Sequence, residues 1–116
     1  HNGKEWLVNM EIDKEVIYLA TTDEPYSKQS AMLDYKKDNL KNVKGCWITA
    51  RATEVPKMSM ALLTEEYYST GAYYSAIKEI QELNTIVSTL KNKRATSILK
   101  IDVWRTLEAS RRKGNI

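Results

Sequence analysis

Apolar and polar residues alternate in a short segment near the start of the chain. Large apolar residues stand at every second position from Trp6 to Ile12, so their side chains share one face of an extended strand. Residues 15–21 are rich in β-branched and aromatic residues, which favour strands, and residues 13–14 between the two segments are polar. The pattern predicts two antiparallel strands joined by a turn.

A helix is predicted next, over residues 25–40. Asp23 supplies a side-chain acceptor for the free amides of a first turn, and Pro25 is tolerated there because its position needs no N–H. Apolar residues then recur every seven positions, at Tyr26, Leu33 and Leu40.

A third strand is predicted over residues 46–55, where alternation returns. The inward face is predicted to hold Cys46, Ile48, Ala50 and Ala52, and the outward face holds Trp47 and Arg51. Cys46 is interpreted as a small buried apolar residue. Pro56 ends the segment.

The second half of the chain has helical spacing. It predicts a short helix over residues 59–68, a break at 69–71, a long helix over 72–91, a turn at 92–94 and a further helix over 98–109. In the last segment, alternation typical of a strand competes with helical propensity, and we favour the helix. Four-three spacing marks the buried stripe of the long helix, at Ala76, Ile80, Leu83, Val87 and Leu90.

Together these elements predict an α+β fold: a small antiparallel sheet in β-β-α-β order, followed by two or three helices packed on one face. We expect one domain over residues 1–116, with 5–55 as the β-β-α-β half and 57–112 as the helical half. Residues 1–4 are expected to be disordered or a remnant of recombinant expression, and 113–116 form a basic tail. The first residue is not Met, which leaves open whether the chain is a fragment.

Apolar runs and cysteine usage bear on the compartment. The longest apolar runs fall far below the roughly twenty residues that cross a bilayer, so no membrane partner is predicted. Cys46 is the single cysteine, and the chain has no Asn-x-Ser/Thr acceptor. Both features favour a reducing compartment, and we predict a cytoplasmic protein.

Residues with catalytic chemistry are sparse. The one histidine is His1, at the terminus, and the four glycines are not spaced as a phosphate-binding loop requires. We therefore predict no catalytic residue, no metal ligand, no cofactor and no enzyme activity. One alternative stays open, a metal-dependent enzyme that works through Glu11, Asp13 or Asp34.

Aromatic residues allow two interpretations. The chain has no Phe, so Tyr and Trp supply its aromatic packing. The pairs Tyr67-Tyr68 and Tyr73-Tyr74 are predicted to pack in the core, and the alternative is that they stack on unpaired bases. Trp47, on the outward face of its strand, is expected to be exposed.

Positive charge is concentrated at one end. The formal net charge is +3, yet residues 91–116 carry eight Lys or Arg against two acidic residues, which leaves the rest of the chain at −3. A cluster of cations attracts phosphates, so the first hypothesis is a non-catalytic nucleic-acid-binding accessory domain, with DNA or RNA as ligand. Its predicted contact residues are Arg94, Lys100, Arg105, Arg111, Arg112, Lys113, Trp47 and Arg51.

The alternative hypothesis is a protein-protein interaction module: an inhibitor, an adaptor or an assembly subunit. Self-association through the 72–91 helix is one version of it. Asn84 would then stand at a seam position with Ile77, Ile80 and Val87, where a buried Asn fixes the register of paired helices.

Overall fold

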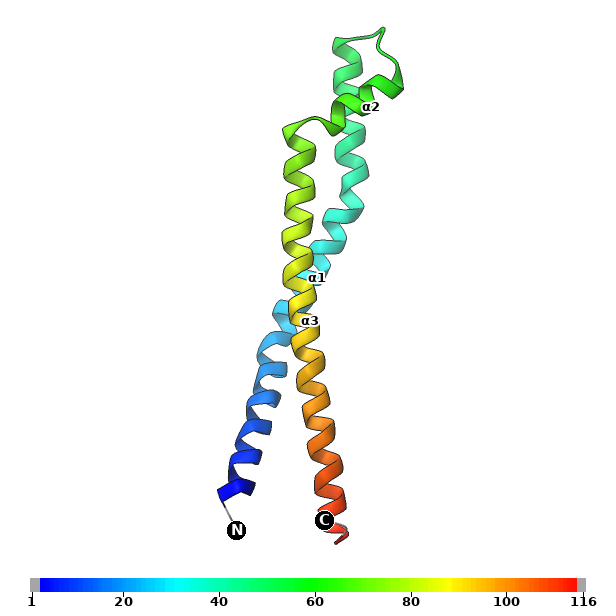
Figure 1. Ribbon diagram of the computed structural model, residues 1–116. Helices are drawn as coiled ribbons and strands as arrows, with labels where there is room; N and C mark the ends of the chain where they lie inside the picture. The colour runs from blue at the N-terminus through cyan, green and yellow to red at the C-terminus, as the bar shows by residue number, and fades with distance from the viewer. Residues whose placement is uncertain (1–2, 115–116) are drawn as a thin grey trace. The chain divides into compact units, whose positions relative to one another are not determined.

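The part of the chain that the structure describes consists of helices and short connecting segments. The computed structural model describes residues 3–114, and the side chains of residues 11–114. It contains α1 (Gly3–Glu54), α2 (Met60–Tyr68) and α3 (Gly71–Arg112) (Figure 1). Contacts divide the chain into two compact units. The terminal unit comprises residues 1–28 and 88–116, and the central unit comprises residues 29–87.

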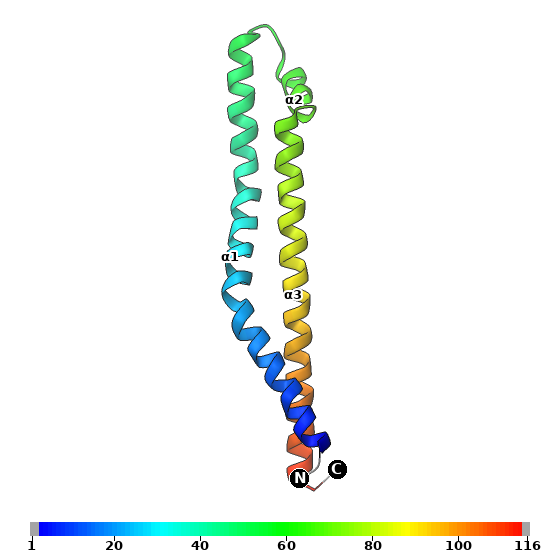
Figure 2. The same cartoon turned by 90° about the vertical axis from the view of Figure 1, so that its left-hand side faces the viewer.

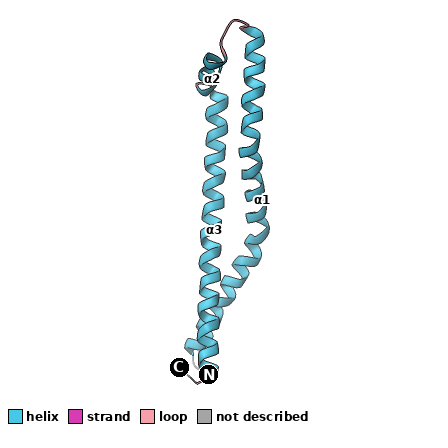
Figure 3. Cartoon of the chain, turned by 90° about the vertical axis from the view of Figure 1, so that its right-hand side faces the viewer, coloured by secondary structure: helices cyan, strands magenta, loops and turns pink. Residues whose placement is uncertain are grey.

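The predicted α+β fold is wrong, because residues 3–114 contain no strand (Figure 3). Residues 15–21 are helical: Glu15, Tyr18 and Leu19 are half-buried, with the spacing of a helix face. A β-branched residue lowers the stability of a helix by about 0.5 kcal/mol relative to alanine. This cost is small, so packing against a second helix outweighs it. The side chains of residues 6–10, on which the first predicted strand depended, lie outside the described ones.

The third predicted strand, residues 46–55, is also helical. Residues four apart share a face in a strand and in a helix, which is why Ile48 and Ala52 fitted both patterns. The helix buries Ile48 and half-buries Ala52, and it exposes Cys46 and Ala50. The interpretation of Cys46 as a buried apolar residue is therefore wrong.

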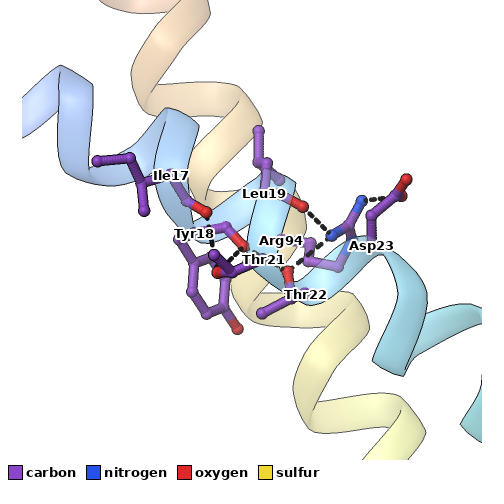
Figure 4. Close-up of polar contacts among 7 residues, drawn as sticks. All are labelled: Ile17, Tyr18, Leu19, Thr21, Thr22, Asp23 and Arg94. Atoms are coloured by element: carbon purple, nitrogen blue, oxygen red, sulfur yellow. Dashed lines mark hydrogen bonds and ion pairs between the residues drawn. The ribbon is translucent and has the colours of Figure 1, made fainter.

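The predicted helix start at residues 23–25 is wrong as well, because α1 is already helical from Gly3. Pro25 lies inside the helix and has no N–H to donate to the carbonyl of Thr21. Just before it, the hydroxyl of Thr21 donates to the carbonyl of Ile17 at 2.9 Å, and that of Thr22 to Tyr18 at 2.6 Å (Figure 4).

The helices of the second half are largely as predicted. Ser59 caps α2, since its hydroxyl accepts a hydrogen bond from the amide of Leu62 at 3.2 Å. The break at residues 69–71 is confirmed, and the Thr70 hydroxyl accepts from the amide of Tyr73 at 3.2 Å. The predicted turn at 92–94 is wrong because α3 continues to Arg112, and the helix predicted over 98–109 is confirmed as part of α3.

The central unit has an aromatic core at one end. Parts of α1 and α3 lie side by side and run in opposite directions (Figure 2). Ile48, Leu63 and Tyr67 are buried together, and five half-buried residues surround them: Trp47, Ala52, Val55, Met58 and Tyr73. Burial raises the pKa of the Tyr67 hydroxyl. Core packing is therefore confirmed for Tyr67 and Tyr73, and the prediction is wrong for Tyr68 and Tyr74, which are exposed.

The predicted stripe of the long helix is confirmed in its spacing. Its members are all half-buried: Ala76, Ile80, Leu83, Val87 and Leu90. Asn84 is exposed in the single chain, and the neighbouring Leu83 is half-buried, so the seam predicted through Asn84 between two copies stays a prediction. The spacing predicted for α1 is also confirmed, because Leu33 is buried and Tyr26 and Leu40 are half-buried.

The terminal unit buries much less. It consists of the start of α1 and the end of α3, and among its described side chains only Ser97 is buried. Across residues 3–114, no helix has an apolar stretch long enough to span a bilayer. Of the predicted terminal segments, Gly3 and Lys4 are helical, and residues 1–2 and 115–116 lie outside the described range.

Candidate functional site

Arg94 of α3 is held by four groups of α1 in the terminal unit. Its Nη1 donates to the carbonyl oxygen of Leu19 at 2.8 Å and to the hydroxyl of Thr22 at 2.7 Å. Its Nη2 lies 3.1 Å from a carboxylate oxygen of Asp23 (Figure 4). The guanidinium also lies over the ring of Tyr26, 5.4 Å from the centroid. The side chain of Arg94 is 17% exposed, so it is largely enclosed by these partners.

This arrangement fixes how the two helices pair. The Thr22 hydroxyl that accepts from Arg94 donates in turn to the carbonyl of Tyr18, so the contacts form a chain of hydrogen bonds. A planar guanidinium satisfies several acceptors in a fixed geometry, which an ammonium group does not. A one-residue shift of α3 along α1 would remove Arg94 from all of these acceptors.

A second polar contact follows one turn further along α3. The buried hydroxyl of Ser97 donates to one carboxylate oxygen of Glu15, and Lys100 Nζ lies 3.3 Å from the other. The hydrogen bond from Ser97 is the main cause that lowers the pKa of Glu15, and Lys100 acts in the same direction. Glu15 is therefore held as a carboxylate between two donors of α3.

An apolar groove of about 400 Å³ adjoins this pair. Trp104 forms part of its wall, and the indole Nε1 of Trp104 is buried with no hydrogen-bond partner among the described residues. The charged groups that line the groove are two carboxylates and one ammonium group. The groove is lined by Glu11, Ile12, Glu15, Leu99, Lys100, Val103, Trp104 and Leu107.

Three of the lining residues form an exposed apolar row on α3. Leu99 is 62% exposed, Val103 51% and Leu107 53%. They are spaced by four residues, so they lie in line on one side of the helix. Ile101 and Trp104, at other angles on the same helix, are half-buried. This stretch of α3 is therefore apolar on two sides.

The residues predicted to bind nucleic acid fall in both units. Trp47 and Arg51 belong to the central unit, where Trp47 packs against Tyr67 with ring centroids 5.7 Å apart. The expectation that Trp47 is exposed is wrong, because it is half-buried. Arg51 contacts Glu54 and Glu66, each at 2.8 Å, and these carboxylates, Glu54 first, raise the pKa of Arg51.

Most of the predicted cations of the terminal unit also have acidic partners. Arg94 contacts Asp23, and Lys100 contacts Glu15. Arg105 lies 3.7 Å from Asp102, and Arg111 contacts Glu108. Arg112 and Lys113 are exposed at the end of the described chain. Sequence analysis missed the acidic partners on α1, because nothing in a linear sequence pairs residues 15 and 100.

Within residues 11–114, no three His, Cys, Asp or Glu side chains are grouped as a metal ion would require. His1 lies outside the described residues. The geometry defines a class, a helical protein in which α1 and α3 pair through a partly polar interface. Comparison with protein-family models, curated proteins and solved structures finds no match for this chain.

Proposed function

We propose that the chain is a protein-protein interaction module, whose terminal unit binds a helix of another polypeptide. The observation that carries this proposal is the apolar row of Leu99, Val103 and Leu107, each more than half exposed. A helix that is apolar on more than one side normally packs against more than one neighbour. Among the described residues of the terminal unit, α1 is the one helix beside α3.

The low burial of the terminal unit supports the same function. Only Ser97 is buried among its described side chains, so two paired helices enclose little apolar surface. Covering the exposed half of three aliphatic side chains contributes roughly 1 kcal/mol each. A helix seated in the groove would also cover Ile12 and Trp104. These residues would form the apolar centre of the contact, and polar groups at its rim would complete it.

The ion pairs make nucleic-acid binding the second choice. That function needs several cations free to contact phosphates on one surface. Arg51, Arg94, Lys100 and Arg105 each contact a carboxylate, so a phosphate would have to displace that carboxylate or share the cation with it. Arg112 and Lys113 stay available as exposed cations. Nucleic-acid binding remains a prediction that the experiment below also tests.

A photo-cross-linking amino acid placed at Val103 in the cell tests the proposal. We expect discrete adducts that survive nuclease and contain peptides of an identifiable protein, because a partner helix would lie against this position. The matched control carries the same amino acid at Lys78, an exposed polar position of α3 in the central unit, and should give no such adduct. Adducts that nuclease removes would favour nucleic-acid binding, and equal labelling at both positions would overturn the proposal.

A further inference from the structure

We infer that the helix that covers the apolar row is α3 of a second copy of this chain, related by a two-fold axis near Val103. This inference rests on the proposed function and names its partner. The row is the same on every copy, so two rows form a self-complementary surface, as a symmetric dimer requires.

The spacing of the row fits such a pairing. Residues four apart form a ridge on the helix surface, and the packing of two such ridges is the commonest class of helix contact. Around a two-fold axis at Val103, the copies of Val103 meet, and Leu99 of each copy lies against Leu107 of the other. All three exposed aliphatic side chains would then be covered by equivalent ones.

The charges beside the row are also complementary in that arrangement. Glu11 lines the groove one helical turn before Glu15, and Glu15 contacts Lys100, so Glu11 lies nearer to the Leu107 end of the groove than Glu15 does. Leu107 would pack against Leu99 of the second copy, so Glu11 would approach Lys100, the residue after Leu99. The side chain of Lys100 is 59% exposed beside Glu15, so its ammonium has donors left for a second carboxylate.

The wider charge distribution of the terminal unit is divided between its two helices. The α1 part of the terminal unit, residues 11–28, carries five Asp or Glu against two Lys. The α3 part, residues 88–114, carries eight Lys or Arg against Asp102 and Glu108. The two-fold contact packs two basic helices against each other, and the acidic helix α1 beside each of them reduces their repulsion.

The oligomeric state of the purified chain tests the inference. Sedimentation equilibrium between about 1 and 200 µM should show a monomer-dimer equilibrium. The substitution Val103→Glu places two like charges at the axis and should raise the dissociation constant at least about tenfold. Met60→Glu, at an exposed apolar residue of the central unit, is the control and should leave it unchanged. A monomer at all concentrations, or a dimer unaffected by Val103→Glu, overturns the inference.

A charge exchange tests the contact between Glu11 and Lys100. Glu11→Lys and Lys100→Glu should each weaken the homodimer, because both contacts then join like charges. When the two variants are mixed, both contacts join opposite charges again, so a heterodimer should form. Circular dichroism checks that each variant remains helical. Failure of two helical variants to form the heterodimer contradicts the arrangement.

A disulfide tests the position of the axis directly. Cys46 is exposed and is the single cysteine, so Cys46→Ser gives a cysteine-free background. Val103→Cys in that background should form a covalent dimer on oxidation, because the two Cα atoms would lie within the roughly 7 Å that a disulfide spans. Ile17→Cys, exposed on α1 and outside the groove, is the control. Equal oxidation of both variants overturns the inference.

The outcomes separate this inference from the proposed function. Adducts at Val103 with a different protein, together with a monomer in sedimentation, would contradict a second copy as the partner. The proposed protein-protein interaction function would still be supported. The absence of any protein adduct in the cell, together with a monomer in sedimentation, would overturn both.

Discussion

The guanidinium of Arg94 lies 2.7 Å from the hydroxyl of Thr22 and 2.8 Å from the carbonyl oxygen of Leu19, although more than seventy positions separate these residues in the sequence. Arg94 occupies a position in α3 that continues the four-three spacing of Leu83, Val87 and Leu90. A cation thus stands where the repeat would place an apolar residue. It fixes the register of the two helices, as a polar residue in a helix interface often does.

Arg94→Ala should lower the free energy of unfolding by roughly 2 to 3 kcal/mol, because charge-assisted hydrogen bonds to partly buried groups are lost and their acceptors remain. Urea denaturation measures the change. Arg105→Ala is the control, since Arg105 makes one exposed contact with Asp102, worth at most about 0.5 kcal/mol. If Arg94→Ala lowers the free energy of unfolding no more than Arg105→Ala does, the contacts of Arg94 with α1 do not stabilise the fold beyond an exposed ion pair.

Stability should fall at acid pH in part through Glu15. The folded-state pKa of Glu15 lies below its ordinary value of 4.5, so its carboxylate stabilises the fold above that value. This contribution disappears as the pH falls through the lowered pKa. Urea midpoints measured from about pH 6 to about pH 3 should show a smaller decrease for Glu15→Gln than for the wild type. Glu24→Gln, an exposed residue paired with Lys28, is the control and should follow the wild type.

Truncation of two neighbouring leucines of α2 to alanine should change the free energy of unfolding by very different amounts. Leu63 is 2% exposed and belongs to the central core, so Leu63→Ala should cost about 2 to 5 kcal/mol. Leu62 is 55% exposed, so Leu62→Ala, which removes the same atoms, should cost less than about 1 kcal/mol. Thermal or urea unfolding followed by circular dichroism measures both. A reversed order would contradict the orientation of α2.

A similar pair tests the register of α3. Leu83 is half-buried and Asn84 is exposed in the single chain. Leu83→Ala should lower the free energy of unfolding by about 2 kcal/mol, and Asn84→Ala should change it by less than about 0.5 kcal/mol. Chemical denaturation of the two variants measures both changes, and a larger loss for Asn84→Ala than for Leu83→Ala would contradict this orientation of α3.

Elements with local chemical signals were predictable from the sequence. Ser59 and Thr70 mark the start of α2 and the break before α3 because their hydroxyls accept hydrogen bonds from nearby amides. The stripe from Ala76 to Leu90 was predictable because it repeats over four turns. The predicted strands were ambiguous, since Ile48 and Ala52, four residues apart, share a face in either structure.

Apolar residues alternate with polar ones over residues 99–103, as in a strand, because this part of α3 is apolar on two sides, the same property that forms the candidate site. Leu99 and Val103 lie on the exposed side of α3, and Ile101 between them is half-buried. Two apolar sides of one helix, read along the chain, resemble the alternation of a strand. The spacing of four from Leu99 to Leu107 was the signal that could have identified the exposed row.

The sequence by itself determined the places where local hydrogen bonds or a long repeat specify a helix: the start of α2, the break at residues 69–71 and the spacing of α3. Only the tertiary structure decided that residues 15–21 and 46–55 are helical and that Arg94 and Lys100 contact acidic residues of α1. The reason is that short β-branched segments have weak intrinsic preferences, so the helix packed against them decides their structure. Whether a cation is free to bind a phosphate likewise depends on carboxylates that are distant in sequence and close in space.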